Sequence, residues 1–207
     1  MITSNNTREI EGFFSNSIDA GCEGIIAKSI QKESIYQAGA RGWLWIKLKE
    51  SYQSKMSDTI DAVIVGAYFG RGKRANMYGA LLCAVLDKIN GTFHTICKIG
   101  SGFSDEDLAE IIQKFEKLKR ETKHPNLNSL IKPDPDIWFE PKYVIEILGD
   151  EITLSNVHTA GYGEIKKDSG LAIRFPRFIR WRDDKSIEDM TTTQEVVDMY
   201  KGQLKKI

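Results

Sequence analysis

The sequence predicts a mainly β protein with a few helices, organised as a small first unit and a larger second unit that forms a five-stranded barrel. Three observations predict this fold class. Apolar runs of strand length recur between polar turns, a helical pattern separates three of these runs from two later ones, and a polar segment without apolar periodicity divides the chain. With 207 residues, of which 41% are hydrophobic, the chain has enough apolar surface for one or two folded cores.

The first unit begins with a short amphipathic helix and continues with two strands. The helix is indicated by apolar residues on one face, which are Ile10, Phe13, Phe14 and Ile18. The strands are expected at 22–28 and 43–49, and the alternation in the second strand places Lys47 and Lys49 on one face. The polar segment 50–58 indicates a linker, so we expect one unit over 1–55 and another over 56–207.

The second unit contains five longer apolar runs. Three of them come first and are expected to be strands at 60–69, 77–87 and 92–99. The last two of these three are joined through Asn90-Gly91, a dipeptide that accepts the backbone angles of a tight turn. Two further strands are expected at 142–154 and 171–175.

Two helices accompany these strands. Ser104 has the position of an N-cap for an amphipathic helix over 105–118, and Thr192 with Glu195 has capping-box spacing for a helix at the end of the chain. Three strands, a helix and two strands is the element order of an oligonucleotide-binding barrel, in which the helix lies between the third and fourth strands.

Charge is balanced overall but segregated along the chain. The formal net charge is zero, with 29 basic and 29 acidic residues. Residues 166–185 contain seven basic and three acidic side chains, whereas 133–151 contain six acidic and one basic. We therefore expect one face of the second unit to be basic, as an anion-binding surface is.

The sequence does not indicate a membrane protein, a secreted protein or a zinc-binding protein. The longest apolar runs are about half of the roughly 18 residues that a membrane span needs, and the first residues lack the pattern of a secretory signal. We expect a cytoplasmic protein. The three cysteines and three histidines do not have zinc-finger spacing.

Four short patches follow one another in the chain: EGIIAK at 23–28, RGWLWIKLK at 41–49, GRGKR at 70–74 and RFPRFIRWRDDK at 174–185. Together they resemble the carboxy-terminal part of an ATP-dependent DNA ligase, most closely the archaeal and eukaryotic replicative type. The resemblance covers nearly the whole chain. It implies the carboxy-terminal part of an adenylation domain in the first unit, an oligonucleotide-binding barrel in the second, and roles in DNA replication, repair and recombination.

In the first unit the resemblance implies a nucleotide site. Glu23 matches the glutamate that helps to hold the catalytic Mg²⁺, and a carboxylate is a ligand that this metal prefers. Arg41 and Lys47 match contacts with ATP or its adenylate, and Lys49 matches a position near the α-phosphate. Two neighbouring ammonium groups repel each other unless they lie against a polyanion. The residues alone also allow a strand-end ion pair for Glu23 and a solvated strand face for the lysines.

In the second unit the resemblance implies contacts with phosphates of ATP and of DNA. Arg180, Arg182 and Lys185 match the residues that orient the β- and γ-phosphates of ATP, where the leaving pyrophosphate gains charge. The remaining matched residues are implied to bind DNA: Arg71, Lys73, Arg74, Arg174, Phe175 and Arg177. Of these, Phe175 matches an aromatic wedge in the minor groove.

Simpler structural roles remain open for the same patches. The loop at 70–74 has the composition of a plain basic hairpin, and Phe175 has that of a core residue. The basic side chains of 174–185 have Asp183 and Asp184 as neighbours, so some of them are expected to form intramolecular ion pairs.

The family forms its first covalent intermediate on the lysine of a K-x-D-G motif. This sequence contains no such motif. The nearest string, Lys167-Asp168-Ser169-Gly170, has the wrong order. We therefore expect a ligase fragment that does not adenylate itself and that acts with the amino-terminal remainder of the ligase, ATP and Mg²⁺ on nicked duplex DNA. Open strand edges in the first unit are compatible with a homodimer. The alternatives are a stand-alone oligonucleotide-binding module without catalysis and an RNA ligase or mRNA-capping type of nucleotidyltransferase.

Overall fold

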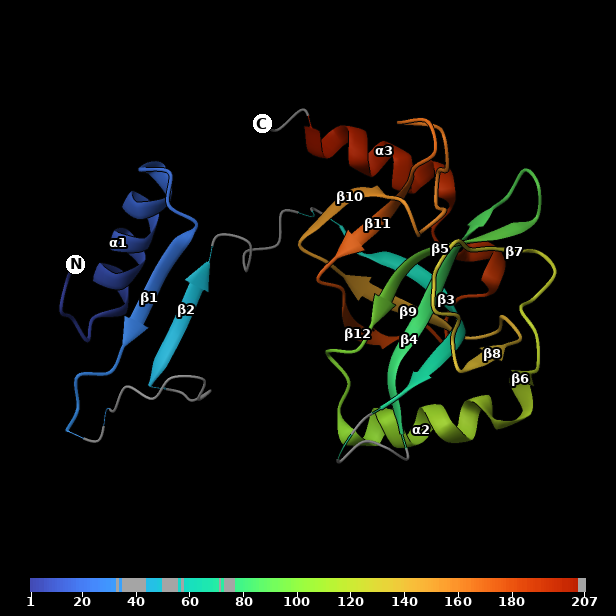
Figure 1. The fold of residues 1–207 in the computed structure, drawn as a ribbon, viewed down its shortest axis with the longest axis horizontal. Helices are drawn as coiled ribbons and strands as arrows, with labels where there is room; N and C mark the ends of the chain where they lie inside the picture. Colours follow the sequence, from blue (N-terminus) through green and yellow to red (C-terminus); the bar gives the residue numbers. More distant parts are fainter. Residues whose placement is uncertain are drawn as a thin grey trace. The chain divides into compact units, whose positions relative to one another are not determined.

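A computed structural model describes residues 1–32, 34, 44–49, 56, 58–70, 72 and 77–204. The chain divides into two compact units, Met1–Gln53 and Ser54–Ile207 (Figure 1). The helices are α1 (Thr7–Asp19), α2 (Asp105–Phe115), η3 (Glu116–Leu118), η4 (Ile187–Asp189) and α3 (Thr193–Leu204). The strands are β1 (Gly24–Lys28), β2 (Trp45–Lys49), β3 (Ile60–Phe69), β4 (Tyr78–Asp87), β5 (Thr92–Ile99), β6 (Lys119–Arg120), β7 (Leu127–Asn128), β8 (Ile137–Phe139), β9 (Val144–Leu148), β10 (Glu151–Ser155), β11 (Gly170–Arg174) and β12 (Arg177–Trp181).

The first unit consists of α1 and an antiparallel pair of strands. Asn6 caps α1 by accepting a hydrogen bond from the backbone N–H of Arg8, and Gly21, with a φ of 81°, follows the last turn. Strands β1 and β2 pair with Gly24 opposite Lys49. Both predicted strands are present, and each begins two residues later than expected.

The second unit is a curled sheet with the barrel topology that the element order predicts. Its strand order is β12-β9-β3-β4-β5-β7, and β10 pairs with β11 as a continuation of the hairpin that β9 forms with β12. Strand β11 lies against β5, which closes the barrel. Helix α2 covers one end of the barrel and α3 lies at the other end (Figure 1). The predicted fold class, mainly β with an oligonucleotide-binding barrel, is confirmed.

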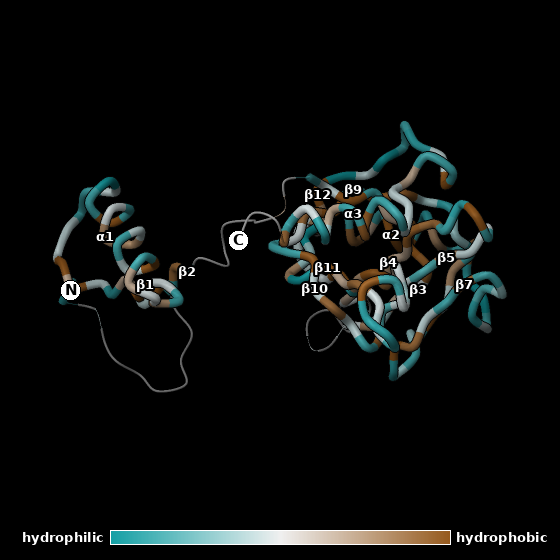
Figure 2. The backbone as a smooth tube through the Cα atoms, turned by 90° about the horizontal axis from the view of Figure 1, so that it is seen from above, coloured by the Kyte–Doolittle hydropathy of each residue, from teal (hydrophilic) through white to brown (hydrophobic). Residues whose placement is uncertain are grey.

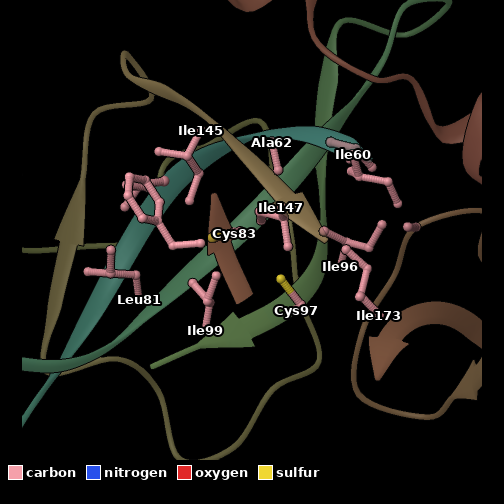
Figure 3. Packing of buried hydrophobic residues seen from close by; sticks show 14 of the residues in the cluster. Ile60, Ala62, Leu81, Cys83, Ile96, Cys97, Ile99, Ile145, Ile147 and Ile173 are labelled. Atoms are coloured by element: carbon pink, nitrogen blue, oxygen red, sulfur yellow. The ribbon is translucent and has the colours of Figure 1, made fainter. Parts of the chain in front are cut away.

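The core fills the inside of this curled sheet. Inward side chains from eight strands of the second unit meet in one cluster, which includes Ile60, Cys83, Cys97, Ile145 and Ile173 (Figure 3). Burying each such isoleucine contributes roughly 1.5–3 kcal/mol relative to leaving it exposed. The hydrophobic residues are concentrated along these strands, while the loops around them are hydrophilic (Figure 2).

Strand β3 is buried on both faces. Ile60, Ala62 and Ile64 face the main core. Val63 and Val65 belong to a second buried cluster, which also contains Met190. Burial on two sides explains why β3 is an almost continuous apolar run rather than an alternating one.

The structure corrects the sequence prediction in the last third of the chain. The strand expected at 142–154 is two strands, β9 and β10, separated at Gly149-Asp150, and β12 was not predicted. The chain comes close to itself at this break, and a Cβ added to Gly149 would clash with the side chain of Ile173. Strand β12 was missed because it contains a β-bulge. Phe178 pairs with Ile147 and Arg180 with Glu146, so Ile179 is an extra residue that interrupts the alternation of inward and outward side chains.

One further region differs from the prediction, and another lies mostly outside the described residues. The proline-containing stretch after α2, where no strand was predicted, contains the short strands β6, β7 and β8. The predicted linker 50–58 lies largely outside the described residues. Within the described part of the chain, no helix is long and apolar enough to cross a membrane.

We predict that His158 makes the barrel sensitive to acid. Its side chain is buried, its Nδ1 atom has no hydrogen-bond partner among the described residues, and burial lowers its pKa to about 4. Between pH 6.5 and 4 the unfolded chain binds a proton that the folded chain does not, so the free energy of unfolding falls as the pH falls through this window. Between pH 7.5 and 5.0 this loss amounts to about 2 kcal/mol.

Urea unfolding of the wild type and His158→Leu at both pH values measures this effect. The variant is expected to lose about 2 kcal/mol less than the wild type on acidification. The comparison at pH 7.5 is the control for lost packing, since the imidazole is neutral there in both states. An equal loss in both proteins would show that His158 is not the group responsible.

Candidate functional site

The structure describes nine of the thirteen site residues that the sequence predicts. The other four, Arg41, Arg71, Lys73 and Arg74, lie outside the described residues. The nine fall into two sets, one on β1 and β2 in the first unit and one along β11, β12 and the turn that follows in the second unit. Each set is described within its own unit.

In the first unit, Glu23 and Lys49 form an ion pair. Lys49 Nζ lies 2.9 Å from Glu23 Oε2, because the register that places Lys49 opposite Gly24 brings the lysine beside the preceding glutamate. The hydrogen bond from Lys49, and the charges of Lys49 and Lys47, lower the pKa of Glu23. The strand-end ion pair therefore exists, and both predicted lysines lie near this ionised carboxylate.

In the second unit, three charged side chains form a row across neighbouring strands. Asp61 on β3 is directly opposite Glu146 on β9, and Glu146 is opposite Arg180 on β12. The side chains of Asp61 and Glu146 are 9% and 13% exposed, whereas the Arg180 side chain is 60% exposed and its Nε donates to Glu146 at 2.6 Å. Like charges directly opposite each other are destabilising, so this acidic pair requires cations.

The turn after β12 supplies two of these cations. The backbone N–H of Lys185 donates to the carbonyl of Arg182 at 3.0 Å, which closes a turn and brings both side chains to Asp61. Arg182 Nη1 contacts both carboxylate oxygens of Asp61 at 2.9 and 3.0 Å, and Lys185 Nζ donates to Oδ2 at 2.6 Å. Arg182 also donates from Nε and Nη2 to Asp184.

Hydrogen bonding favours the ionised forms of Glu146, Arg182 and Asp184. Hydrogen bonds from Thr59 and Arg180 lower the pKa of Glu146. The hydrogen bond to Asp184 raises the pKa of Arg182, and the same bond lowers the pKa of Asp184. Three cations and three carboxylates, Arg180, Arg182 and Lys185 with Asp61, Glu146 and Asp184, therefore form a cluster with balanced charge, which we call the barrel-edge cluster.

The bend between β11 and β12 carries the remaining predicted residues. Phe175 is 54% exposed and has a φ of 50°, a left-handed backbone conformation that costs a bulky residue roughly 1–2 kcal/mol. The guanidinium of Arg174 lies 5.0 Å from the centre of the Phe175 ring. Arg174 is paired with Glu151 and Arg177 with Asp150. A core position for Phe175 is therefore excluded.

The sequence reasoning missed Asp61 and Glu146. It expected the basic segment to pair with Asp183 and Asp184, and the structure shows this for Asp184, whereas Asp183 contacts Lys114 at 3.5 Å. One signal was available: Asp61 is the only charged residue in the apolar run 60–69, and a lone buried carboxylate requires a cationic partner. The identity of that partner, 121 residues away, had no local signal.

Comparison with known protein families and sequences gives consistent matches. Residues 74–185 match the family described as ATP dependent DNA ligase C terminal region, and residues 1–49 match the ATP dependent DNA ligase domain. The chain is 54% identical over 205 residues to the DNA ligases of Saccharolobus solfataricus and Saccharolobus shibatae. These matches cover 99% of this chain and 34% of each relative, so the chain spans about a third of their length.

Among solved structures, the ligase domain of LigD from M. tuberculosis matches with a TM-score of 0.51 and 23% identity, over 86% of this chain and 50% of that one. This likeness shows a shared fold. The two family matches leave out residues 50–73, and they include the first helix and, at their end, Arg180, Arg182 and Lys185 of the barrel-edge cluster. The chain belongs to the family of ATP-dependent DNA ligases.

Proposed function

We propose that this chain forms the carboxy-terminal portion of a ligase that uses ATP to seal nicks in duplex DNA. The observation that carries the proposal is the barrel-edge cluster, in which a turn holds Arg182 and Lys185 against one carboxylate beside the exposed Arg180. Three cations at one edge of an oligonucleotide-binding barrel form a site for a polyphosphate. In this family the corresponding residues orient the phosphates of ATP.

The proposed reaction has three steps. A lysine amine of the remaining part of the ligase attacks the α-phosphorus of ATP, so that an N–P bond forms, the bond to pyrophosphate breaks and the amine loses a proton. The adenylate then passes to the 5′-phosphate at the nick, and the 3′-hydroxyl displaces AMP to form the phosphodiester. In the first step Arg180, Arg182 and Lys185 stabilise the negative charge that develops on the leaving pyrophosphate.

The first unit contributes groups near the α-phosphate in this proposal. Lys47 and Lys49, with Arg41, bind the nucleotide, and Glu23 supplies one carboxylate to Mg²⁺. The structure fits a ligand of this kind, because Glu23 is ionised and exposed, and Mg²⁺ takes one or two protein carboxylates with phosphate and water. No cluster of three or more potential metal ligands occurs among the described residues. When bound, the metal would neutralise phosphate charge.

The bend at Phe175 is the proposed DNA contact. A strained backbone that exposes an aromatic ring is costly for folding and is typical of a functional position. Arg174, whose guanidinium lies against this ring, and Arg177, two residues after it, contact DNA phosphates in this proposal. Arg71, Lys73 and Arg74 add charge for the DNA backbone.

The amino-terminal remainder of the ligase is the proposed partner of the first unit. This unit has only a two-stranded sheet in its described part, and Ile26 and Ile46 are about half exposed on it. An isolated strand pair is marginal in water, so residues 1–55 are proposed to complete an adenylation domain in the cytoplasm. The same edges would pair with a second copy if the chain forms a homodimer.

The first prediction of this proposal concerns complementation. This chain, mixed with or fused to a ligase's amino-terminal portion that carries K-x-D-G, is expected to restore sealing of nicked DNA. Nicked RNA is the comparison substrate. Sealing of RNA but not DNA would favour the RNA ligase alternative, and salt-sensitive nucleic-acid binding without any sealing would favour a stand-alone module.

A labelling experiment tests the absence of the nucleophile. This chain alone, incubated with α-labelled ATP and Mg²⁺, is expected to carry no covalently bound, alkali-stable label because its sequence contains no K-x-D-G. The complemented mixture is the positive control. A labelled band from this chain would show that one of its own residues is adenylated.

A second prediction separates the steps of the reaction. Lys185→Ala is expected to slow enzyme adenylation at least about tenfold and the sealing of pre-adenylated nicked DNA less than about threefold, because pyrophosphate is present only in the first step. Lys166→Ala, the same change at an exposed position, is the control. Equal losses in both assays would refute the role of Lys185 in orienting pyrophosphate.

A third prediction concerns Phe175. Phe175→Asn is expected to reduce sealing of nicked DNA about tenfold while changing the free energy of unfolding by less than about 0.5 kcal/mol, since asparagine tolerates the left-handed backbone. Ile89→Asn, at another exposed apolar position, is expected to seal normally. Undiminished sealing by Phe175→Asn would remove Phe175 from the DNA site.

A further inference from the structure

Asp61 is the point at which the barrel holds the two cations of the turn. Arg182 Nη1 and Lys185 Nζ both lie within 3.0 Å of its carboxylate. Two cations that close repel each other, and the shared carboxylate offsets this repulsion. Within the turn, Asp184 pairs with Arg182 and Asp183 with Lys114, so the contacts of the described residues show the bridging role for Asp61 and not for these two.

The position of this carboxylate is fixed by the sheet. Asp61 lies between Ile60 and Ala62, whose side chains are fully buried in the core. Its backbone N–H donates to Thr191 Oγ1 at 2.9 Å, and its carbonyl accepts from the Thr191 N–H at 3.0 Å. The buried strand β3 therefore fixes the position of the Asp61 carboxylate. Through its contacts with Arg182 and Lys185, this carboxylate fixes two side chains of the turn after β12.

The two cations differ in what remains available to a ligand. Arg182 uses Nε, Nη1 and Nη2 in its contacts with Asp61 and Asp184, so fewer of its five N–H donors remain for a ligand. Lys185 has three donors and a side chain that is 31% exposed, and it gives one hydrogen bond to Asp61. An anion at this site would contact the ammonium group of Lys185, whose position is fixed by its hydrogen bond to Asp61.

Stability alone does not account for a carboxylate at this position. Asp61 directly opposes Glu146, and replacing a buried ion pair by apolar residues is often neutral or stabilising. From these contacts we propose that Asp61 is a positioning residue, which holds Arg182 and Lys185 where they meet the β- and γ-phosphates of ATP. This inference rests on the proposed function and adds to it a residue outside the four sequence patches.

The test compares two steps of the reaction in the complemented ligase that contains the full chain. Asp61→Asn keeps the shape and removes the charge, and it is expected to slow enzyme adenylation at least about tenfold. Sealing of pre-adenylated nicked DNA is expected to stay within about twofold of the wild type, because no pyrophosphate leaves in that step. Glu140→Gln, which removes the carboxylate that holds Arg120 elsewhere in the barrel, is expected to leave both rates unchanged.

Asp61→Glu keeps the charge and moves the carboxylate by one methylene, so it is expected to slow adenylation less than Asp61→Asn does. If Asp61→Asn does not fold, Asp61→Glu decides: a loss of about threefold or more confined to adenylation supports the inference. Unchanged adenylation, or an equal loss in both steps, overturns it. An inactive wild-type mixture overturns the proposed function and this inference with it, whereas an active wild type matched by Asp61→Asn overturns the inference alone.

Discussion

Two carboxylates that face each other across β3 and β9 determine how the charged side chains of the barrel-edge cluster are arranged. Asp61 and Glu146 are direct cross-strand neighbours, and both are largely shielded from water. A shielded pair of like charges is stable only when cations are held against it. Arg180 on β12 meets one carboxylate, and the turn after β12 returns to place Arg182 and Lys185 on the other. The basic segment is therefore part of the barrel's own charge balance.

Strand β12 combines core packing with a charged outer face because of one extra residue. Phe178 stacks on Phe103 and contacts Trp181, so both aromatic residues of the strand pack inward although they are three positions apart. Without the bulge at Ile179, regular alternation would place Phe178 on the same face as Arg180. The bulge thus allows a short strand to close the core and to present cations at the same time. The bend before it exposes Phe175.

The sequence predicted the parts of the fold that depend on local patterns. Strand β5 has the predicted bounds, and α2 begins after Ser104, the N-cap that the sequence predicts. The prediction failed where the period changes or the partner is distant. A bulge changes the period in β12, and the contact between Asp61 and Arg182 joins residues 121 positions apart. Family resemblance named the cations, but only the folded chain shows which carboxylates hold them.

A double-mutant cycle on the isolated chain tests most directly whether Asp61 holds the turn. The free energies of unfolding of Asp61→Asn, Lys185→Gln and the double variant are compared with the wild type. Because the two side chains share a hydrogen bond of 2.6 Å, the single effects are expected to be non-additive by about 1 kcal/mol. Additivity to within about 0.5 kcal/mol would contradict the account, since the carboxylate and the lysine would then act independently.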